Sequence, residues 1–224
     1  MSEPTAVIFD LDDTLYPERR FALSGYAAVA AQVAEGTGIP AGAVYRFLVR
    51  RVRRAGRDGL LQALCAAFAL PVADIPGYVE TIRTHPPRLR YPSRSRAVLA
   101  ALRGRGHRLG VLTNGLPSTQ RGKIAALGLR RDVDAIVYAQ ECAPAGKPAR
   151  ACFTTALGRL GVAAPRAVFV GDHPEKDIAG ARAAGLHTVW LPGRTTMVDA
   201  GPDAVAGCID DVPALVDRLL EGVQ

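Results

Sequence analysis

The sequence has few cysteines and no long apolar run. Its four cysteines, Cys65, Cys142, Cys152 and Cys208, form neither a CxxC zinc pair nor the dense pattern of a disulfide scaffold. No stretch approaches the roughly twenty apolar residues that a membrane-spanning helix needs. The first apolar segment begins at Ala6, which leaves no space for a signal peptide. We therefore expect a cytoplasmic protein with reduced thiols and no membrane partner.

Lysine is scarce as well. Arginine supplies nearly all of the net charge of +7, because the only lysines are Lys123, Lys147 and Lys176. A basic chain can bind nucleic acid or an anionic substrate. No RNA- or DNA-binding module signature accompanies the charge here, so background composition is the favoured interpretation and nucleic acid is not an expected partner. The patterns predict no oligomeric state.

Hydrophobic residues make up 49% of the chain and charged residues 22%, which is typical of a globular protein with a sizeable core. Short apolar runs alternate with helical patterns from residue 93 onward. This alternation predicts an α/β fold, a doubly wound, Rossmann-like core with five parallel strands. The expected strands are 6–9, 108–112, 134–138, 167–170 and 188–191, and the expected helices are 95–104, 118–127, 149–160, 176–184 and 212–221.

A helical insertion is predicted directly after the first strand. Apolar residues recur at three- and four-residue spacing in 19–35, 41–55, 59–70 and 75–84. Prolines flank this region at Tyr16-Pro17 and at His85-Pro86-Pro87, where they restrict the backbone and suit a two-stranded hinge. We expect a catalytic core of residues 1–15 and 89–224 and a helical-bundle cap of residues 16–88.

Four polar signatures occur in one order along the chain. They are Asp10-Leu11-Asp12-Asp13-Thr14, Leu112-Thr113-Asn114-Gly115, Lys147-Pro148 and Gly171-Asp172-His173-Pro174-Glu175-Lys176-Asp177. Three of them directly follow predicted parallel strands, and ligands of an open α/β sheet bind beyond the carboxyl ends of its strands. We therefore expect the four signatures to converge at one edge of the sheet.

Each signature can support phosphate chemistry, although each also has a structural interpretation. Asp10 and Asp12 are close enough to repel, which suits either a divalent metal or an acid/base partner to a nucleophile. Asp172 and Asp177 follow a strand as carboxylates that could hold Mg²⁺. The alternative for both pairs is helix capping.

The other two signatures carry a hydroxyl and a charge. Thr113 and Asn114 lie in a glycine-containing turn, which is common by itself but can hold a phosphate oxygen. Lys147 would be a surface lysine in most proteins, yet beside a phosphoryl group it would neutralise charge.

Together the four signatures resemble the motifs of the haloacid dehalogenase superfamily, and most of all its phosphatases with an α-helical cap inserted after the first strand. The resemblance covers essentially the whole chain. It implies that Asp10 attacks phosphorus to form an aspartyl phosphate, and that Asp12 protonates the leaving oxygen and then activates water. It also implies a Mg²⁺ ion held by the Asp10 side chain, the Asp12 backbone carbonyl and Asp172.

The resemblance assigns the remaining residues to phosphate binding and support. Thr113, the backbone of Asn114 and Lys147 would hold the phosphoryl oxygens. Asp177 would order the metal waters and Lys147, and Thr14 would support the same group. Lys147-Pro148 is followed by Ala-Arg where the commoner family form has Asp-Pro.

Asp12 favours phosphoryl transfer over dehalogenation, because a carbon–halogen bond needs no protonated leaving group. The expected activity is hydrolysis of a small phosphate ester, a sugar phosphate or a nucleoside monophosphate. A sugar-phosphate mutase has the same acid and stays open. A rival of another class is a non-catalytic nucleic-acid-binding protein that uses the arginines between Arg46 and Arg57, whose other interpretation is a solvated basic face.

Overall fold

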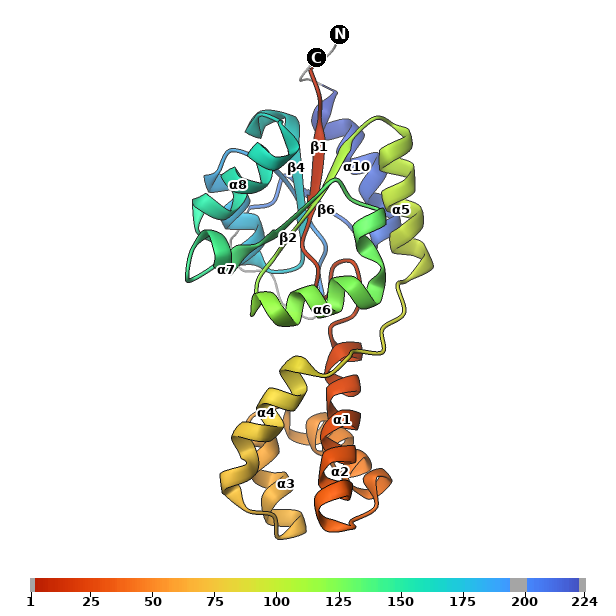
Figure 1. Ribbon diagram of the computed structural model, residues 1–224. Coiled ribbons are helices and arrows are strands. Elements are labelled where there is room, and N and C mark those ends of the chain that lie inside the picture. The colour runs from red at the N-terminus through yellow and green to blue at the C-terminus, as the bar shows by residue number, and fades with distance from the viewer. Residues whose placement is uncertain (1–2, 194–200, 222–224) are drawn as a thin grey trace. The chain divides into compact units, whose positions relative to one another are not determined.

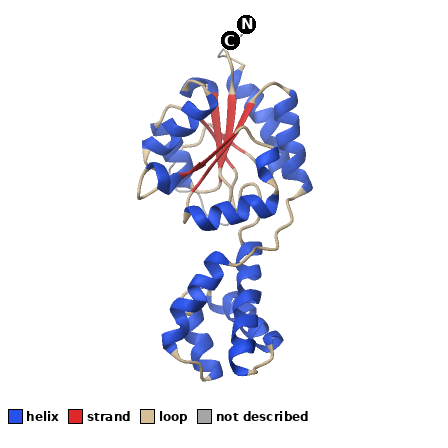
Figure 2. Cartoon of the chain, in the orientation of Figure 1, coloured by secondary structure: helices blue, strands red, loops and turns tan. Residues whose placement is uncertain are grey.

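The computed structural model describes residues 3–193 and 201–221. Within them the chain divides into two compact units, one of residues Met1–Pro17 with Arg90–Gln224 and the other of residues Glu18–Leu89. The first unit contains a parallel sheet with the strand order β3-β2-β1-β4-β5-β6 (Figures 1 and 2). The strands are β1 (Ala6–Phe9), β2 (Arg108–Thr113), β3 (Ala135–Tyr138), β4 (Ala167–Gly171), β5 (His187–Trp190) and β6 (Ala204–Val205).

Helices cover both faces of this sheet (Figure 1). They are α5 (Ser93–Gly104), α6 (Pro117–Leu127), α7 (Ala139–Cys142), α8 (Arg150–Leu160), α9 (Gly180–Ala183) and α10 (Val212–Leu220). All four residues of β1 are fully buried, as expected for a central strand with both faces covered. Ala6 and Ile8 pack into one cluster with Phe153 of α8 and Ala181 of α9.

The sequence patterns locate the helix ends of this unit well. Glycine follows four of the helical stretches, at Gly106, Gly128, Gly161 and Gly185, and the φ angles there are +86°, +67°, +60° and +87°. Such left-handed residues are typical just past the end of a helix. Helix α6 begins with Pro117, whose missing N–H is not needed in the first turn of a helix.

The second unit is a bundle of four helices. They are α1 (Arg19–Thr37), α2 (Ala41–Ala55), α3 (Leu60–Phe68) and α4 (Ile75–Thr84). Its core gathers apolar side chains from every helix, among them Val29, Leu48, Leu64 and Tyr78. The bounds of α2 and α4 are those that the apolar spacing predicts.

The sheet differs from the prediction in having six strands rather than five. Strand β6 is only two residues long and pairs with β5 through Val189 and Trp190, and two residues show no periodicity that a sequence pattern could reveal. A further difference lies after β4. Residues Pro174–Ala179 form a π-helical turn, in which Ile178 N donates to His173 O, before α9 continues as an α-helix.

The parallel topology brings the predicted signatures to one edge of the sheet. Strand β1 pairs with β2 on one side and with β4 on the other. The chain order reverses at this point, which is where α/β sheets form a ligand-binding crevice. Asp10 directly follows β1, and Asp172 directly follows β4.

Replacing Phe153 by alanine tests the packing of α8 on the sheet. Phe153 is fully buried and meets the ring of Phe169 edge to face at 5.3 Å. We expect Phe153→Ala to lower the free energy of unfolding by about 3–5 kcal/mol, because it leaves a cavity in the core. Urea denaturation measures the loss. Leu116→Ala, at a side chain with 48% exposure, is the control, and an equal loss in both variants would contradict the assigned packing.

Candidate active site

A buried lysine joins two carboxylates at the carboxyl edge of the sheet. Lys147 Nζ donates to Asp10 Oδ1 at 2.5 Å and to Asp177 Oδ1 at 2.6 Å. All three residues are almost fully buried. Burial works against the charged ammonium, but the two carboxylates outweigh it and raise the pKa of Lys147 above its ordinary value. Lys147 is therefore a permanent positive charge between Asp10 and Asp177.

Three separate segments supply this cluster. Asp10 continues β1, and its backbone N–H donates to Val170 O of β4 at 2.9 Å. The π-helical turn directs Asp177 back toward the strand end, where its Oδ2 accepts a hydrogen bond from His173 N at 3.0 Å. Gly171 makes this return possible, because a Cβ atom there would lie 2.5 Å from Asp177 Oδ2.

The asparagine after β2 fixes the backbone of Lys147. Lys147 N donates to Asn114 Oδ1 at 2.8 Å, and Asn114 Nδ2 donates to Lys147 O at 3.1 Å. This pair of hydrogen bonds closes the loop of residues 143–149 onto the end of β2. Asn114 therefore positions Lys147 with its side chain, a contact that the sequence pattern did not predict.

Asp172 completes a group of three carboxylates. Oxygen atoms of Asp10, Asp172 and Asp177 all lie within 4.8 Å of one another. Burial, with Asp177 and Asp13 nearby, raises the pKa of Asp172 to about 6. Burial also raises the pKa of Asp10 to about 8, although Lys147 opposes the shift. Burial is the main cause of both shifts, and the neighbouring carboxylates add to it.

This donor set fits a small divalent cation. Carboxylate oxygens are hard ligands of the kind that Mg²⁺ prefers, and a second positive charge would balance the three carboxylates. The Thr14 hydroxyl is also buried and has no hydrogen-bond partner among the residues that the structure describes. An unpaired buried hydroxyl next to the acidic turn is available to a ligand or a water molecule.

Asp12 lies in a different environment from Asp10. Its carboxylate accepts hydrogen bonds from Lys123 Nζ at 2.9 and 2.8 Å, from Gln120 Nε2 at 2.9 Å and from the Tyr16 hydroxyl at 2.6 Å. Gln120 Nε2 also donates to Thr113 Oγ1 at 2.6 Å. The acidic turn itself is tight, because Asp13 has a positive φ of 56° and its N–H donates to Tyr16 O.

Sequence reasoning missed Gln120, Lys123 and Tyr16. We placed Tyr16 at the hinge and treated Lys123 only as one of the rare lysines. A signal was present in the predicted helix, because Gln120 and Lys123 are three residues apart on the same face as the apolar Ile124 and Leu127. Polar residues on a buried face of a helix need partners.

The arginines of α2 are mostly solvated. Arg46, Arg50, Arg53 and Arg54 are exposed. Arg51 donates to Gly56 O and Asp58 O, and Arg57 lies beyond the helix and forms an ion pair with Glu18.

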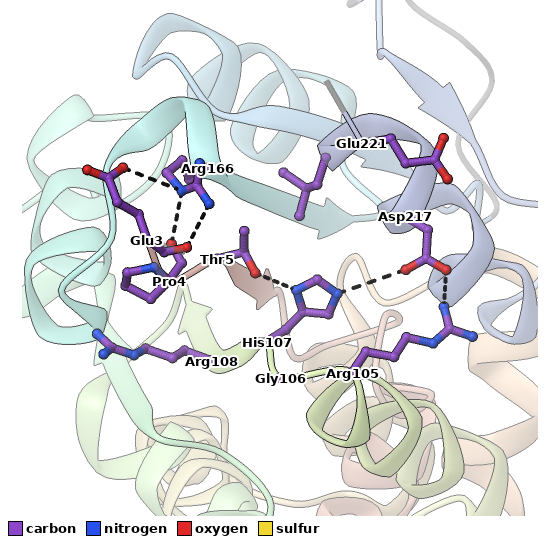
Figure 3. Close-up of a pocket in the computed structure, with 11 residues that line it drawn as sticks. Glu3, Pro4, Thr5, Arg105, Gly106, His107, Arg108, Arg166, Asp217 and Glu221 are labelled. Carbon is purple, nitrogen blue, oxygen red and sulfur yellow. Dashed lines mark hydrogen bonds and ion pairs between the residues drawn. The ribbon is translucent and has the colours of Figure 1, made fainter. Parts of the chain in front are cut away.

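A pocket of about 850 Å³ lies at the opposite, amino-terminal edge of the strands (Figure 3). It is lined by Glu3, Pro4, Thr5, Arg105, Gly106, His107, Arg108, Arg166, Asp217, Leu220 and Glu221. Its charged side chains largely satisfy one another, since Arg105 pairs with Asp217 and Arg166 with Glu3. None of the predicted site residues lines it, and we assign it no part in the chemistry.

Comparison with known proteins identifies the family. Residues 4–185 match the model of the haloacid dehalogenase-like hydrolases. A phosphoserine phosphatase of Thermus thermophilus is 40% identical over 129 residues, which span 56% of this chain and 51% of that protein. A glyceraldehyde 3-phosphate phosphatase of Methanopyrus kandleri is 33% identical over 83% of both chains. A phosphoglycolate phosphatase of Rhodospirillum rubrum is 34% identical over 96% of this chain and 91% of the relative.

Solved structures share the fold. A haloacid dehalogenase-family phosphatase from Thermococcus onnurineus has a TM-score of 0.64 at 24% identity and covers 95% of this chain and 97% of its own. A 2-haloacid dehalogenase from Pseudomonas syringae has a TM-score of 0.67 at 26% identity, with 96% and 99% covered. This chain belongs to the haloacid dehalogenase-like hydrolases and is a phosphatase of that family. No helix in the described part of the chain is long and apolar enough to cross a membrane.

Gly171→Ala tests the close approach of Asp177 to the end of β4. The new methyl group would overlap Asp177, so we expect a loss of about 1–3 kcal/mol in the free energy of unfolding. Thermal or urea unfolding of the purified variant measures it. Gly104→Ala is the matched control, because a Cβ atom there meets nothing within 4 Å, and a Gly171 variant as stable as this control would refute the crowding.

Proposed function

We propose that the protein is a Mg²⁺-dependent phosphomonoesterase that hydrolyses a small phosphorylated metabolite through an aspartyl phosphate on Asp10. The observation that carries the proposal is the buried ion pair of Lys147 with Asp10 and Asp177 beside Asp172. A carboxylate can attack an anionic phosphate only where positive charge offsets their repulsion. Lys147 supplies part of that charge in contact with the attacking group.

Asp10 acts as the nucleophile. Lys147 holds its Oδ1, which orients the carboxylate and leaves Oδ2 for attack on phosphorus. Lys147, the Thr113 hydroxyl and the backbone N–H of Asn114 bind the phosphoryl oxygens and stabilise the charge that spreads over them in the transition state. The two hydrogen bonds between the Asn114 side chain and the Lys147 backbone keep Lys147 beside the end of β2 during this step.

Asp12 acts as general acid and then as general base. It donates a proton to the departing alkoxide in the first step, and in the second it takes a proton from the water that hydrolyses the aspartyl phosphate. Asp10, Asp172 and the backbone carbonyl of Asp12 would hold Mg²⁺, with Asp177 and Thr14 in support. When bound, the ion supplies Lewis-acid stabilisation of the phosphoryl charge.

The substrate class is a small phosphorylated carboxylate, aldehyde or sugar. Relatives of at least 30% identity are named for phosphoserine, glyceraldehyde 3-phosphate, phosphoglycolate and ribulose 1,5-bisphosphate, which supports hydrolysis over phosphoryl mutation and small substrates over nucleotides. Residues 1–15 and 89–224 form the catalytic core in this proposal, and residues 16–88 form the cap that selects the leaving group. A phosphate-release screen with these four esters and nucleoside monophosphates tests the choice.

Replacing the nucleophile tests the mechanism. Asp10→Asn removes the attacking oxygen and one negative charge, so we expect kcat to fall more than about a thousandfold. Phosphate release from the best ester of the screen measures the loss. Circular dichroism of the variant controls for folding, and phosphate release at the wild-type rate would exclude Asp10 as nucleophile.

Removing the metal gives a separate test. Excess EDTA should stop phosphate release and Mg²⁺ should restore it, whereas Ca²⁺ should restore little because its longer bonds and larger ligand number misplace Asp10. Isothermal titration with Asp172→Asn should show weaker Mg²⁺ binding than the wild type. Full activity in excess chelator would rule out a metal-dependent reaction.

A further inference from the structure

Helix α6 carries a buried lysine to which the proposed mechanism gives no role. Lys123 is 5% exposed, and Gln120, one turn earlier, is 1% exposed. A buried ammonium is costly unless a carboxylate and further hydrogen bonds compensate it. The group that pairs with Lys123 therefore indicates what the lysine does.

That group is the carboxylate of Asp12. The Lys123 ammonium spans both of its oxygens at 2.9 and 2.8 Å. Tyr16 donates to Oδ1 and Gln120 donates to Oδ2. The four hydrogen bonds are shared evenly, two to each oxygen of the carboxylate. Asp12 cannot turn about its side-chain bonds without breaking one of them.

The same cluster reaches the proposed phosphate-binding end of β2. The Gln120 amide donates to Thr113 Oγ1 at 2.6 Å as well as to Asp12. Thr113 is fully buried. Gln120 thereby links the Asp12 carboxylate to Thr113, which binds the substrate phosphate in the proposed mechanism.

Helix packing fixes the two donors. Helix α6 begins at Pro117, three residues after Asn114, so the loop between β2 and α6 is short. Residues three apart lie on one helical face, and the neighbouring Ile124 and Leu127 on that side are buried. Lys123 therefore approaches Asp12 from a rigid element rather than from a loop.

We propose that Lys123 is a positioning residue for Asp12. It holds the carboxylate at the carboxyl edge of the sheet and sets the direction in which Asp12 meets the leaving oxygen, while Gln120 couples that orientation to Thr113. This inference rests on the proposed phosphomonoesterase activity. Lys123 acts on the leaving group only through Asp12.

The test compares two kinds of leaving group. An alkoxide needs the proton that Asp12 delivers, whereas 4-nitrophenolate departs with little help. In Lys123→Met we expect the rate of leaving-group release in a single turnover, which reports the first step alone, to fall about 10- to 100-fold more on the alkyl ester than on 4-nitrophenyl phosphate, since misplacing a catalytic group by about 1 Å can cost about a hundredfold. KM should change little for either ester. The alkyl ester is whichever of glyceraldehyde 3-phosphate, phosphoserine and phosphoglycolate the wild type hydrolyses fastest.

A double-mutant cycle separates positioning from folding. Asp12→Asn combined with Lys123→Met should be no slower on the alkyl ester than Asp12→Asn alone, because the lysine has no other route to the reaction. The double variant also leaves no unpaired, partly buried carboxylate at residue 12, so it decides the question if Lys123→Met alone folds poorly. Arg218→Met places methionine at an exposed basic side chain of α10 and should keep wild-type kinetics on both esters.

The possible outcomes are distinct. Equal losses on the two esters in Lys123→Met, or multiplied losses in the double variant, would overturn the positioning role and leave the phosphatase mechanism standing. A wild type that releases phosphate from neither ester with Mg²⁺ would overturn the proposed substrate class and mechanism, and this inference with them.

Discussion

The ion pair of Lys147 with Asp10 and Asp177 constrains the whole carboxyl edge of the sheet. An ammonium that is only 3% exposed costs several kcal/mol if its partners are removed, so β1, the loop of residues 143–149 and the turn after β4 must come together in one arrangement. Asn114 holds the backbone of Lys147 from β2, and Gly171 leaves the space that Asp177 occupies. Several independent contacts thereby hold the carboxyl edge, to which we assign the chemistry, and a preorganised site requires such support.

The parallel topology explains why distant residues can meet there. Asp10, Thr113 and Asp172 follow β1, β2 and β4, and these three strands are neighbours in the sheet. Only the third signature, at Lys147, comes from a loop that does not directly follow a strand, and the side chain of Asn114 holds the backbone of that loop. The opposite edge has a pocket of about 850 Å³ whose ion pairs are internally balanced, whereas the three carboxylates at the carboxyl edge outnumber the ammonium of Lys147.

The sequence predicted what depends on short-range pattern. Strand β1, helices α2 and α4 and the glycine helix ends follow from apolar spacing and backbone conformation, and strand order places Asp10 and Asp172 on one edge. Strand β6 escaped prediction because two residues carry no periodicity. The π-helical turn before α9 escaped because it depends on Asp177 reaching back to Lys147, which is a tertiary contact. The roles of Gln120 and Lys123 were not predicted, because a helical pattern shows which face of the helix is buried but does not show which residue that face contacts, here Asp12.

The two aspartates of one short motif end in opposite electrostatic surroundings. Asp10 shares Lys147 with Asp177 and lies among further carboxylates, so burial and charge raise its pKa and leave it in need of a cation. Asp12, two residues later, has a lysine of its own and two neutral donors. Alternation along an extended chain would place these two side chains on the same face. The chain leaves the extended conformation after Asp10 and turns at Asp13, whose φ is 56°, so the two carboxylates meet different partners. The lysines on either side then give each carboxylate a separate partner, and different environments are what allow two chemically identical groups to take different catalytic roles.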